Sequence, residues 1–112
     1  IVLVVNNAMY GTIRMHQERH FPGRVSGTDL RNPDFVKLAN AYGAFAERVT
    51  TSAEFPAAFA RAQASGTLAL LELRVHPEAL TPAVTLSQTR KAALGPAAHT
   101  PPVSEGRVLA AF

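Results

Sequence analysis

The stretch Ile1-Val2-Leu3-Val4-Val5-Asn6-Asn7-Ala8-Met9-Tyr10-Gly11-Thr12-Ile13-Arg14 decides the fold class of this chain of 112 residues. Its first five residues are aliphatic, four of them β-branched, and they run directly into a pair of asparagines. Such a run predicts a strand buried on both faces, as in a parallel sheet. The asparagines then stand at the carboxyl end of the strand, where open α/β sheets bind ligands. On the pattern alone, the favoured interpretation of Asn6-Asn7 is an ordinary turn that ends a strand.

The rest of the chain alternates helical and strand patterns. We expect a short helix over 10–18, a loop over 20–31, a helix from Asn32 to Gly43, a strand over 45–49, a helix over 56–64 and a strand over 68–75. Asn32 is the expected N-cap of its helix, with Pro33 at the first helical position. The strand over 45–49 has mixed polarity, which favours an outer position. The order predicts βαβ units with right-handed crossovers, hence part of a three-layer α/β/α domain with a parallel sheet.

Composition narrows the possible classes of protein. The formal charge of +3 comes from 11 basic against 8 acidic residues without a basic run, which does not indicate a nucleic-acid surface. The absence of cysteine excludes disulfides and thiolate sites and fits a cytoplasmic protein. The aliphatic runs are too short to cross a membrane, and the four histidines lack zinc-site spacing. We expect one domain over residues 1–90 and a disordered Ala/Pro-rich tail over 91–112.

Three segments together point to a known family. Residues 6–14, followed by Pro22-Gly23 and Asn32-Pro33-Asp34-Phe35, resemble the C-terminal domain of thiamine diphosphate-dependent enzymes. The resemblance covers about residues 1–90 and is to the acetolactate synthase, pyruvate oxidase and benzoylformate decarboxylase group. In that family a Gly-Asp-Gly motif opens the cofactor site and an Asn-Asn pair closes it. Because this chain lacks Gly-Asp-Gly, we expect a fragment that carries half of a cofactor site and is inactive alone.

The resemblance also assigns residues to the site. It implies that the Asn7 side chain and the Met9 main-chain oxygen bind Mg²⁺, with Tyr10 and Gly11 beside the thiamine diphosphate. The amino end of the helix over 10–18 would then face the diphosphate. Thr12, Ile13 and His16 would be the residues nearest the substrate, while the catalytic residues stay unidentified.

The loop that follows offers two further candidates. His20 and Arg24, together with His16, either meet a substrate carboxylate or are simply solvated. Some relatives have a carboxylate at the position that Ile13 occupies in this chain. The isoleucine found here argues against a close relative of pyruvate decarboxylase.

The resemblance implies a lyase or transferase that depends on thiamine diphosphate and Mg²⁺. Its substrates would be 2-oxo acids, in decarboxylation or in acetolactate synthase-like carboligation. The parent would include a pyrimidine-binding domain and form a homodimer or homotetramer, with neither nucleic acid nor membrane as a partner. The alternative is a non-catalytic α/β interaction module in which Asn6-Asn7 is only a structural turn.

Overall fold

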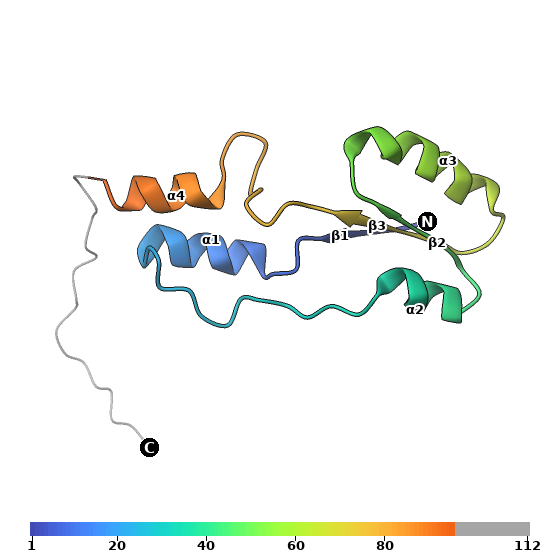
Figure 1. The fold of residues 1–112 in the computed structure, drawn as a ribbon, viewed down its shortest axis with the longest axis horizontal. Coiled ribbons are helices and arrows are strands. Elements are labelled where there is room, and N and C mark those ends of the chain that lie inside the picture. The colour runs from blue at the N-terminus through green and yellow to red at the C-terminus, as the bar shows by residue number, and fades with distance from the viewer. Residues whose placement is uncertain (96–112) are drawn as a thin grey trace, which may run out of the picture.

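A computed structural model describes residues 1–95 and shows a parallel sheet with helices on both faces (Figure 1). The elements are β1 (Val2–Asn6), α1 (Gly11–His20), α2 (Phe35–Ala41), β2 (Phe45–Val49), a 3₁₀ turn η1 (Ser52–Glu54), α3 (Phe55–Ala64), β3 (Ala69–Arg74) and α4 (Leu86–Ala93). The three strands lie in the order β1-β3-β2 and are all parallel. The predicted α/β class and the outer position of the second strand are therefore confirmed.

The core lies where α3 covers β2 and β3. Ala58 and Ala62 on α3 are buried against Ala69 and Leu71 on β3 and Val49 on β2. Alanine side chains let the helix approach the sheet closely, and partly buried phenylalanines of α3 and β2 fill the space around them. The other face is covered by α2, which packs on the same two strands (Figure 1).

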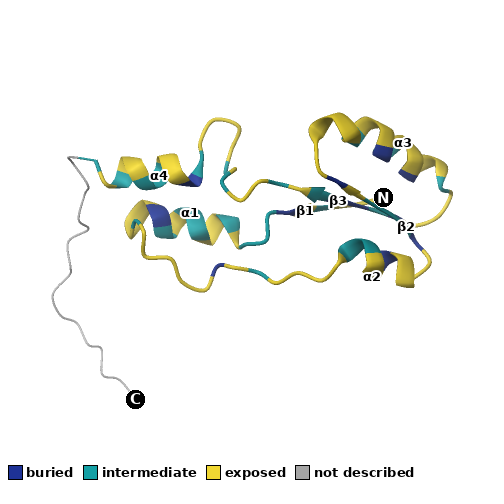
Figure 2. Ribbon diagram, in the orientation of Figure 1, coloured by how far each residue is buried: buried dark blue, intermediate teal, exposed yellow. Residues whose placement is uncertain are grey.

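The first strand departs from the prediction. It forms an edge of the sheet and pairs only with β3. Most of its side chains are exposed, so the expected burial on both faces is wrong for the described residues. Val5 is 66% exposed and Leu3 is 46% exposed. The reason is that α2 and α3 pack on β2 and β3 rather than on β1. Figure 2 shows that the buried positions of α3, in contrast, lie on its side toward the sheet.

The second helix begins later than predicted. Its N-cap is Asp34, whose side chain accepts a hydrogen bond from the Lys37 N–H at 3.2 Å. Asn32 lies before the helix and donates from Nδ2 to Asn6 Oδ1 at 2.9 Å instead. Because Asp34 caps the helix, Asn32 lies outside it and contacts β1.

The last helix was not predicted from the sequence, although Thr85 and Gln88 have the spacing of a capping box. Residues 86–93 form α4, capped by the Thr85 side chain, which accepts from the Gln88 N–H at 3.1 Å. This helix packs on α1 beyond the end of the strands (Figure 1). It crosses the expected start of the tail at residue 91, and residues 96–112 lie outside the described residues, so their disorder stays a prediction. Within residues 1–95, no helix is long and apolar enough to cross a membrane.

Candidate functional site

The site expected from the sequence is the loop that joins β1 to α1, and Asn6 anchors it. Asn6 is 4% exposed. Its Oδ1 accepts from the Ala8 N–H at 3.0 Å, and its Nδ2 donates to Glu72 Oε1 at 2.7 Å. Its backbone carbonyl accepts from the Val75 N–H at 3.0 Å. Asn6 is therefore fixed to the strand beside it before the loop begins.

The two proposed metal ligands follow on this loop. Asn7 Oδ1 accepts from the Met9 N–H at 3.1 Å, which leaves a second lone pair on that oxygen. Among the hydrogen bonds described for residues 1–95, none ends on the Met9 carbonyl oxygen. The structure thus places a side-chain oxygen and an unused main-chain oxygen two residues apart at the carboxyl edge of the sheet.

The Asn7 side chain restricts which residue fits at Gly11, the first residue of α1. A Cβ at Gly11 would lie 2.8 Å from Asn7 Nδ2, so any larger residue there displaces the Asn7 amide. Tyr10 is the N-cap residue of α1, but its side chain makes no capping hydrogen bond. The Tyr10 N–H donates to the Thr28 carbonyl at 2.8 Å, which pins the loop to the segment before α2. The first N–H groups of α1 consequently remain available to an external acceptor.

A small hollow of about 240 Å³ lies beside this loop. It is lined by Asn7, Gly11, Thr12, Met15, Ala79 and Leu80. The wall opposite the loop thus comes from the connection between β3 and α4, a segment to which sequence reasoning gave no role. Cofactor candidates from the first loop and residues from the far end of the chain meet here.

The candidate substrate residues lie on the outer part of α1 and beyond it. Ile13 is 52% exposed, and Thr12 and His16 are exposed as well. The His16 and His20 rings stack with their centroids 6.1 Å apart, while the Arg24 guanidinium lies 5.9 Å from the Phe21 ring. These residues are exposed in the described chain.

Two buried carboxylates were not singled out from the sequence. Glu72, in the central strand, is 1% exposed and accepts from Arg48 Nε at 2.7 Å and from Arg74 Nη1 at 3.3 Å, besides Asn6. Burial raises the pKa of Glu72, but hydrogen bonds from Arg48, Asn6 and Arg74 outweigh burial and leave the pKa lowered. A charged residue inside the apolar run of β3 is the signal that could have revealed it.

The second buried carboxylate links the two helices beyond the sheet. Glu18 on α1 is fully buried and accepts from Arg90 on α4 at 2.7 Å and from Arg14 at 3.0 Å. The hydrogen bond from Arg90 is the main cause that lowers the pKa of Glu18 to about 2. Arg90 thereby fixes α4 against the helix that begins at the candidate site.

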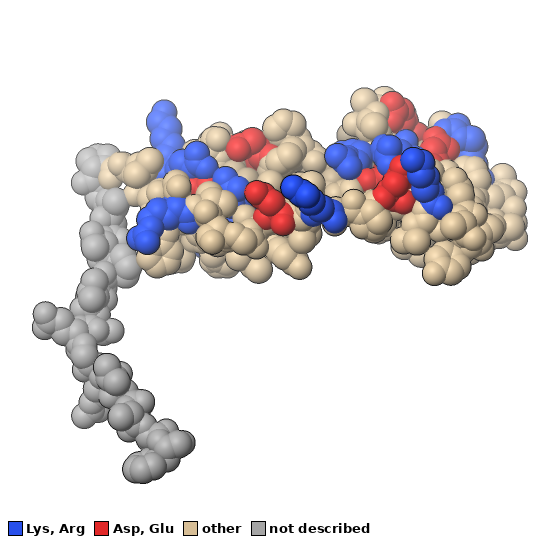
Figure 3. All heavy atoms as spheres, turned by 60° about the horizontal axis from the view of Figure 1, so that its bottom comes forward, with Lys and Arg blue, Asp and Glu red and all other residues tan. Residues whose placement is uncertain are grey.

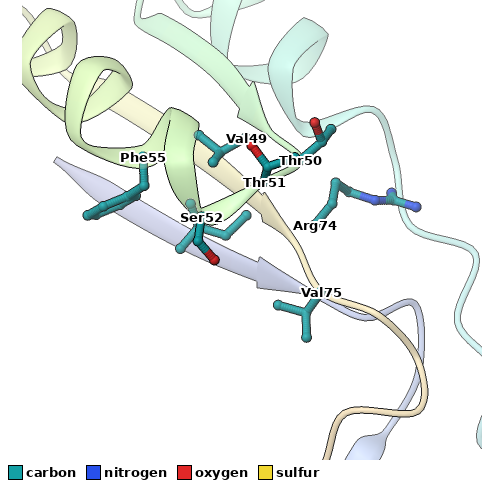
Figure 4. A pocket seen from close by; sticks show the side chains of 8 residues that line it. Val49, Thr50, Thr51, Ser52, Phe55, Arg74 and Val75 are labelled. Carbon is teal, nitrogen blue, oxygen red and sulfur yellow. The ribbon is translucent and has the colours of Figure 1, made fainter. Parts of the chain in front are cut away.

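Two other hollows lie at the carboxyl ends of the strands. One of about 510 Å³ is polar and is lined by Asn6, Ala8, Asn32, Pro33, Asp34, Arg48, Thr50, Glu72 and Arg74. The other, of about 380 Å³, lies on the α3 side, where Phe55 and Val75 line it and the Arg74 guanidinium points away (Figure 4). Neither is lined by Asn7 or Gly11, whereas the hollow beside α1 is lined by both, and Met9 lines none of these three hollows.

On the face that Figure 3 shows, the charges of the described residues do not form a surface of one sign. Figure 3 shows acidic and basic side chains interleaved on the visible face, over both ends of the described chain. Ion pairs such as Arg61–Glu47 and Arg48–Asp34 account for part of this mixture.

Sequence similarity to known proteins shows the family of this chain. Residues 1–73 match the family described as "Thiamine pyrophosphate enzyme, C-terminal TPP binding domain". The chain belongs to this family. The resemblance inferred from the Asn-Asn stretch is thereby confirmed, including the sequence similarity to acetolactate synthases.

The curated relatives of this chain are much longer than the chain itself. The chain is 37% identical over 67 residues to the acetolactate synthase large subunit of Corynebacterium glutamicum, and the match covers 55% of this chain and 11% of that protein. The same subunit of Cyanidium caldarium is 38% identical over 53 residues, covering 46% and 9%. The 3D-(3,5/4)-trihydroxycyclohexane-1,2-dione hydrolase of Bacillus velezensis is 31% identical over 86 residues, covering 71% and 14%. The chain thus spans about a tenth of the length of these relatives.

Proposed function

We propose that this chain contributes the Asn-Asn half of a Mg²⁺–diphosphate site to a thiamine diphosphate-dependent enzyme acting on 2-oxo acids. The observation that carries the proposal is the pairing of Asn7 Oδ1 with the unused Met9 carbonyl oxygen at the carboxyl edge of a parallel sheet. Mg²⁺ is a hard cation that takes oxygen ligands, and it is usually held by few protein groups together with phosphate oxygens. Two neutral oxygens from one loop fit such a site, in which phosphate oxygens supply further ligands.

The residues around this pair also fit a diphosphate. The first turn of α1 has no acidic residue, and its N-cap leaves the leading N–H groups unused. Such a helix terminus favours an anion because its N–H groups and dipole point toward the ligand. The missing Cβ at Gly11 gives room for the Asn7 amide beside that terminus. Bound thiamine diphosphate supplies an electron sink for carbanion chemistry, whereas these residues bind and orient it.

The reaction is proposed from the relatives and from the exposed end of the site. We place 2-oxo acid decarboxylation or acetolactate synthase-like carboligation, by a lyase or transferase, on the side of α1 that carries Thr12, Ile13 and His16. A pyrimidine-binding domain and a second subunit, in a homodimer or homotetramer, complete the proposed enzyme. A cytoplasmic location is part of the same proposal, supported by the absence of cysteine.

The test is binding of Mg²⁺ and thiamine diphosphate to the protein that carries this chain. Asn7→Ala removes one of the two proposed ligands, and we expect the Kd for Mg²⁺ in the presence of thiamine diphosphate to rise about tenfold or more. Asn40→Ala is the matched control, because Asn40 is an exposed asparagine on α2 far along the chain from the loop. Isothermal titration calorimetry measures both variants.

The alternative function predicts a different result. A non-catalytic interaction module that uses Asn6-Asn7 only as a turn binds neither Mg²⁺ nor thiamine diphosphate. In that case Asn7→Ala changes stability by the loss of one turn hydrogen bond, about 1 kcal/mol, and leaves the calorimetric trace flat in wild type and variant alike. Such a flat trace for the wild-type protein would overturn the proposal.

A further inference from the structure

The central strand carries a buried carboxylate that the proposed function does not use. Glu72 lies in β3, directly beside Val4 of β1 and Arg48 of β2 in the parallel register. Isolated buried carboxylates are costly, so a retained one is expected to have partners and a role. Its partners reach both neighbouring strands, and one of them is the asparagine that opens the candidate loop.

The two oxygens of Glu72 hold different groups. Oε2 accepts from Arg48 Nε at 2.7 Å, and Oε1 accepts from Asn6 Nδ2 at 2.7 Å. Because the carboxylate can only accept, it selects the orientation of the Asn6 amide in which nitrogen faces Glu72. The amide oxygen is then turned toward the loop, where it accepts from the N–H of Ala8 and from Asn32 Nδ2.

The loop needs this support because its backbone is unusual at Ala8. Ala8 has φ 57°, in the left-handed region that a residue with a Cβ rarely adopts. Two hydrogen bonds hold it there, from the Ala8 N–H to Asn6 Oδ1 and from the Leu30 N–H to the Ala8 carbonyl. Ala8 lies between the two proposed ligands, so its conformation sets the direction of Asn7 relative to the Met9 carbonyl.

We propose that Glu72 is a positioning residue for the cofactor site, acting through Asn6 to fix the turn at Ala8 that aims Asn7 and Met9 at one ion. This inference rests on the proposed function and deepens it. Glu72 touches neither the ion nor the diphosphate in this scheme. Arg48 extends the support to α2, since its Nη2 donates to the helix-capping residue Asp34 at 3.1 Å.

The first test is Glu72→Gln in the full protein. Glutamine keeps the volume but turns one acceptor into a donor, so either Asn6 or Arg48 loses its partner. We expect the Kd for Mg²⁺, measured by calorimetry with thiamine diphosphate present, to rise about tenfold to a hundredfold, as when the partners of metal ligands are changed. The matched control is Glu47→Gln, an ion-paired glutamate of β2 that pairs with Arg61 and does not contact the loop. Its Kd is expected to stay within about twofold of wild type.

A polarity exchange separates positioning from a merely structural role. Asn6→Asp combined with Glu72→Gln reverses donor and acceptor between the two side chains and restores both the bond and the acceptor for the Ala8 N–H. We expect the double variant to recover the Kd to within about threefold of wild type. Asn6→Asp alone sets two carboxylates face to face and is expected to weaken binding. Tighter binding by Asn6→Asp alone would show a charge effect and overturn the inference.

The outcomes separate this inference from the proposed function. If Asn7→Ala weakens Mg²⁺ binding while folded Glu72→Gln binds like wild type, the positioning role is overturned and the function stands. If the wild-type protein binds neither Mg²⁺ nor thiamine diphosphate, the proposed function fails first. If Glu72→Gln does not fold, Asn6→Asp replaces it, because it changes the other partner of the same hydrogen bond. An unchanged Kd in folded Asn6→Asp overturns the inference.

Discussion

At the scale of single residues, the Asn7 amide occupies space that is open only because residue 11 is a glycine. A Cβ at Gly11 would lie 2.8 Å from Asn7 Nδ2, which is the far end of a side chain that can move. Gly11→Ala should therefore cost little stability, and alanine gains up to about 1 kcal/mol of helix propensity over glycine. The displaced amide, however, should raise the Kd for Mg²⁺ about tenfold. Thermal unfolding and calorimetry on the same sample measure the two effects.

A variant with lower melting temperature and unchanged Mg²⁺ binding would contradict this expectation for Gly11. Gly95→Ala is a useful comparison, because a Cβ there would lie 3.3 Å from the Ala92 carbonyl, far along the chain from the loop. It should leave Mg²⁺ binding unchanged.

The left-handed conformation of Ala8 leads to a second prediction at this scale. A left-handed backbone costs a residue with a Cβ about 1–2 kcal/mol, whereas glycine adopts it freely. Ala8→Gly relieves this cost but makes the unfolded chain more flexible by about 0.4–1 kcal/mol. We expect a net change in the free energy of unfolding between zero and a gain of about 1.6 kcal/mol. Ala60→Gly, at an exposed position within α3, should instead lose about 1 kcal/mol in the same denaturant titration. Equal losses for the two variants would contradict the role of φ at Ala8.

At the scale of elements, the contact between α1 and α4 depends on a single buried acid. Glu18 is fully buried and binds Arg90 across the two helices. Arg90→Ala leaves this carboxylate with Arg14 and the Gly23 N–H as its remaining partners. Breaking a buried pair costs about 3 kcal/mol or more, and the partial exposure of Arg90 reduces that to about 2 kcal/mol. Hydrogen exchange in residues 86–93 should rise accordingly, whereas Arg61→Ala, which breaks an exposed pair, should leave it unchanged.

The same contact predicts a dependence on pH. The folded-state pKa of Glu18 is about 2, mainly through the hydrogen bond from Arg90, against 4.5 for an ordinary glutamate. Since the folded pKa is the lower one, Glu18 contributes its full stabilisation above about pH 4.5 and loses it as the pH falls toward 2. We expect α4 to detach from α1 within that window, seen as loss of protection in residues 86–93. Glu18→Gln should remove the pH dependence from this window, and a wild-type profile in that variant would argue against Glu18 as its source.

The elements also show what the sequence could and could not predict. The helix over 55–64 and the strand over 69–74 were predictable, because their apolar residues recur with the period of each structure and Gly66 marks the end of the helix. The helix α4 was not predicted, because Leu86 is its only buried residue and the ion pair of Arg90 with Glu18 joins residues far apart in the sequence. The loop at Asn6-Asn7 was placed correctly, but its support by Asn32 and Glu72 joins residues 26 and 66 positions away, which no local pattern contains.

At the scale of the whole molecule, the exposed first strand is the feature with the largest consequence. Ile1, Val2, Leu3 and Val5 are each between 45% and 66% exposed, and β1 pairs on one side only. An apolar strand with an unpaired edge is a template for strand addition by another chain. We therefore expect the chain of 112 residues, produced alone, to self-associate.

Leu3→Lys tests this expectation, because a lysine on an edge strand opposes pairing with a second edge. The variant should raise the monomer fraction in sedimentation velocity at matched concentration. Leu68→Lys is the control, since Leu68 is 63% exposed but lies outside the strands, and it should change the monomer fraction much less. A wild-type chain that is monomeric and melts cooperatively would contradict association through β1. If both lysine variants dissolve the aggregates equally, general apolar exposure rather than the strand edge drives association.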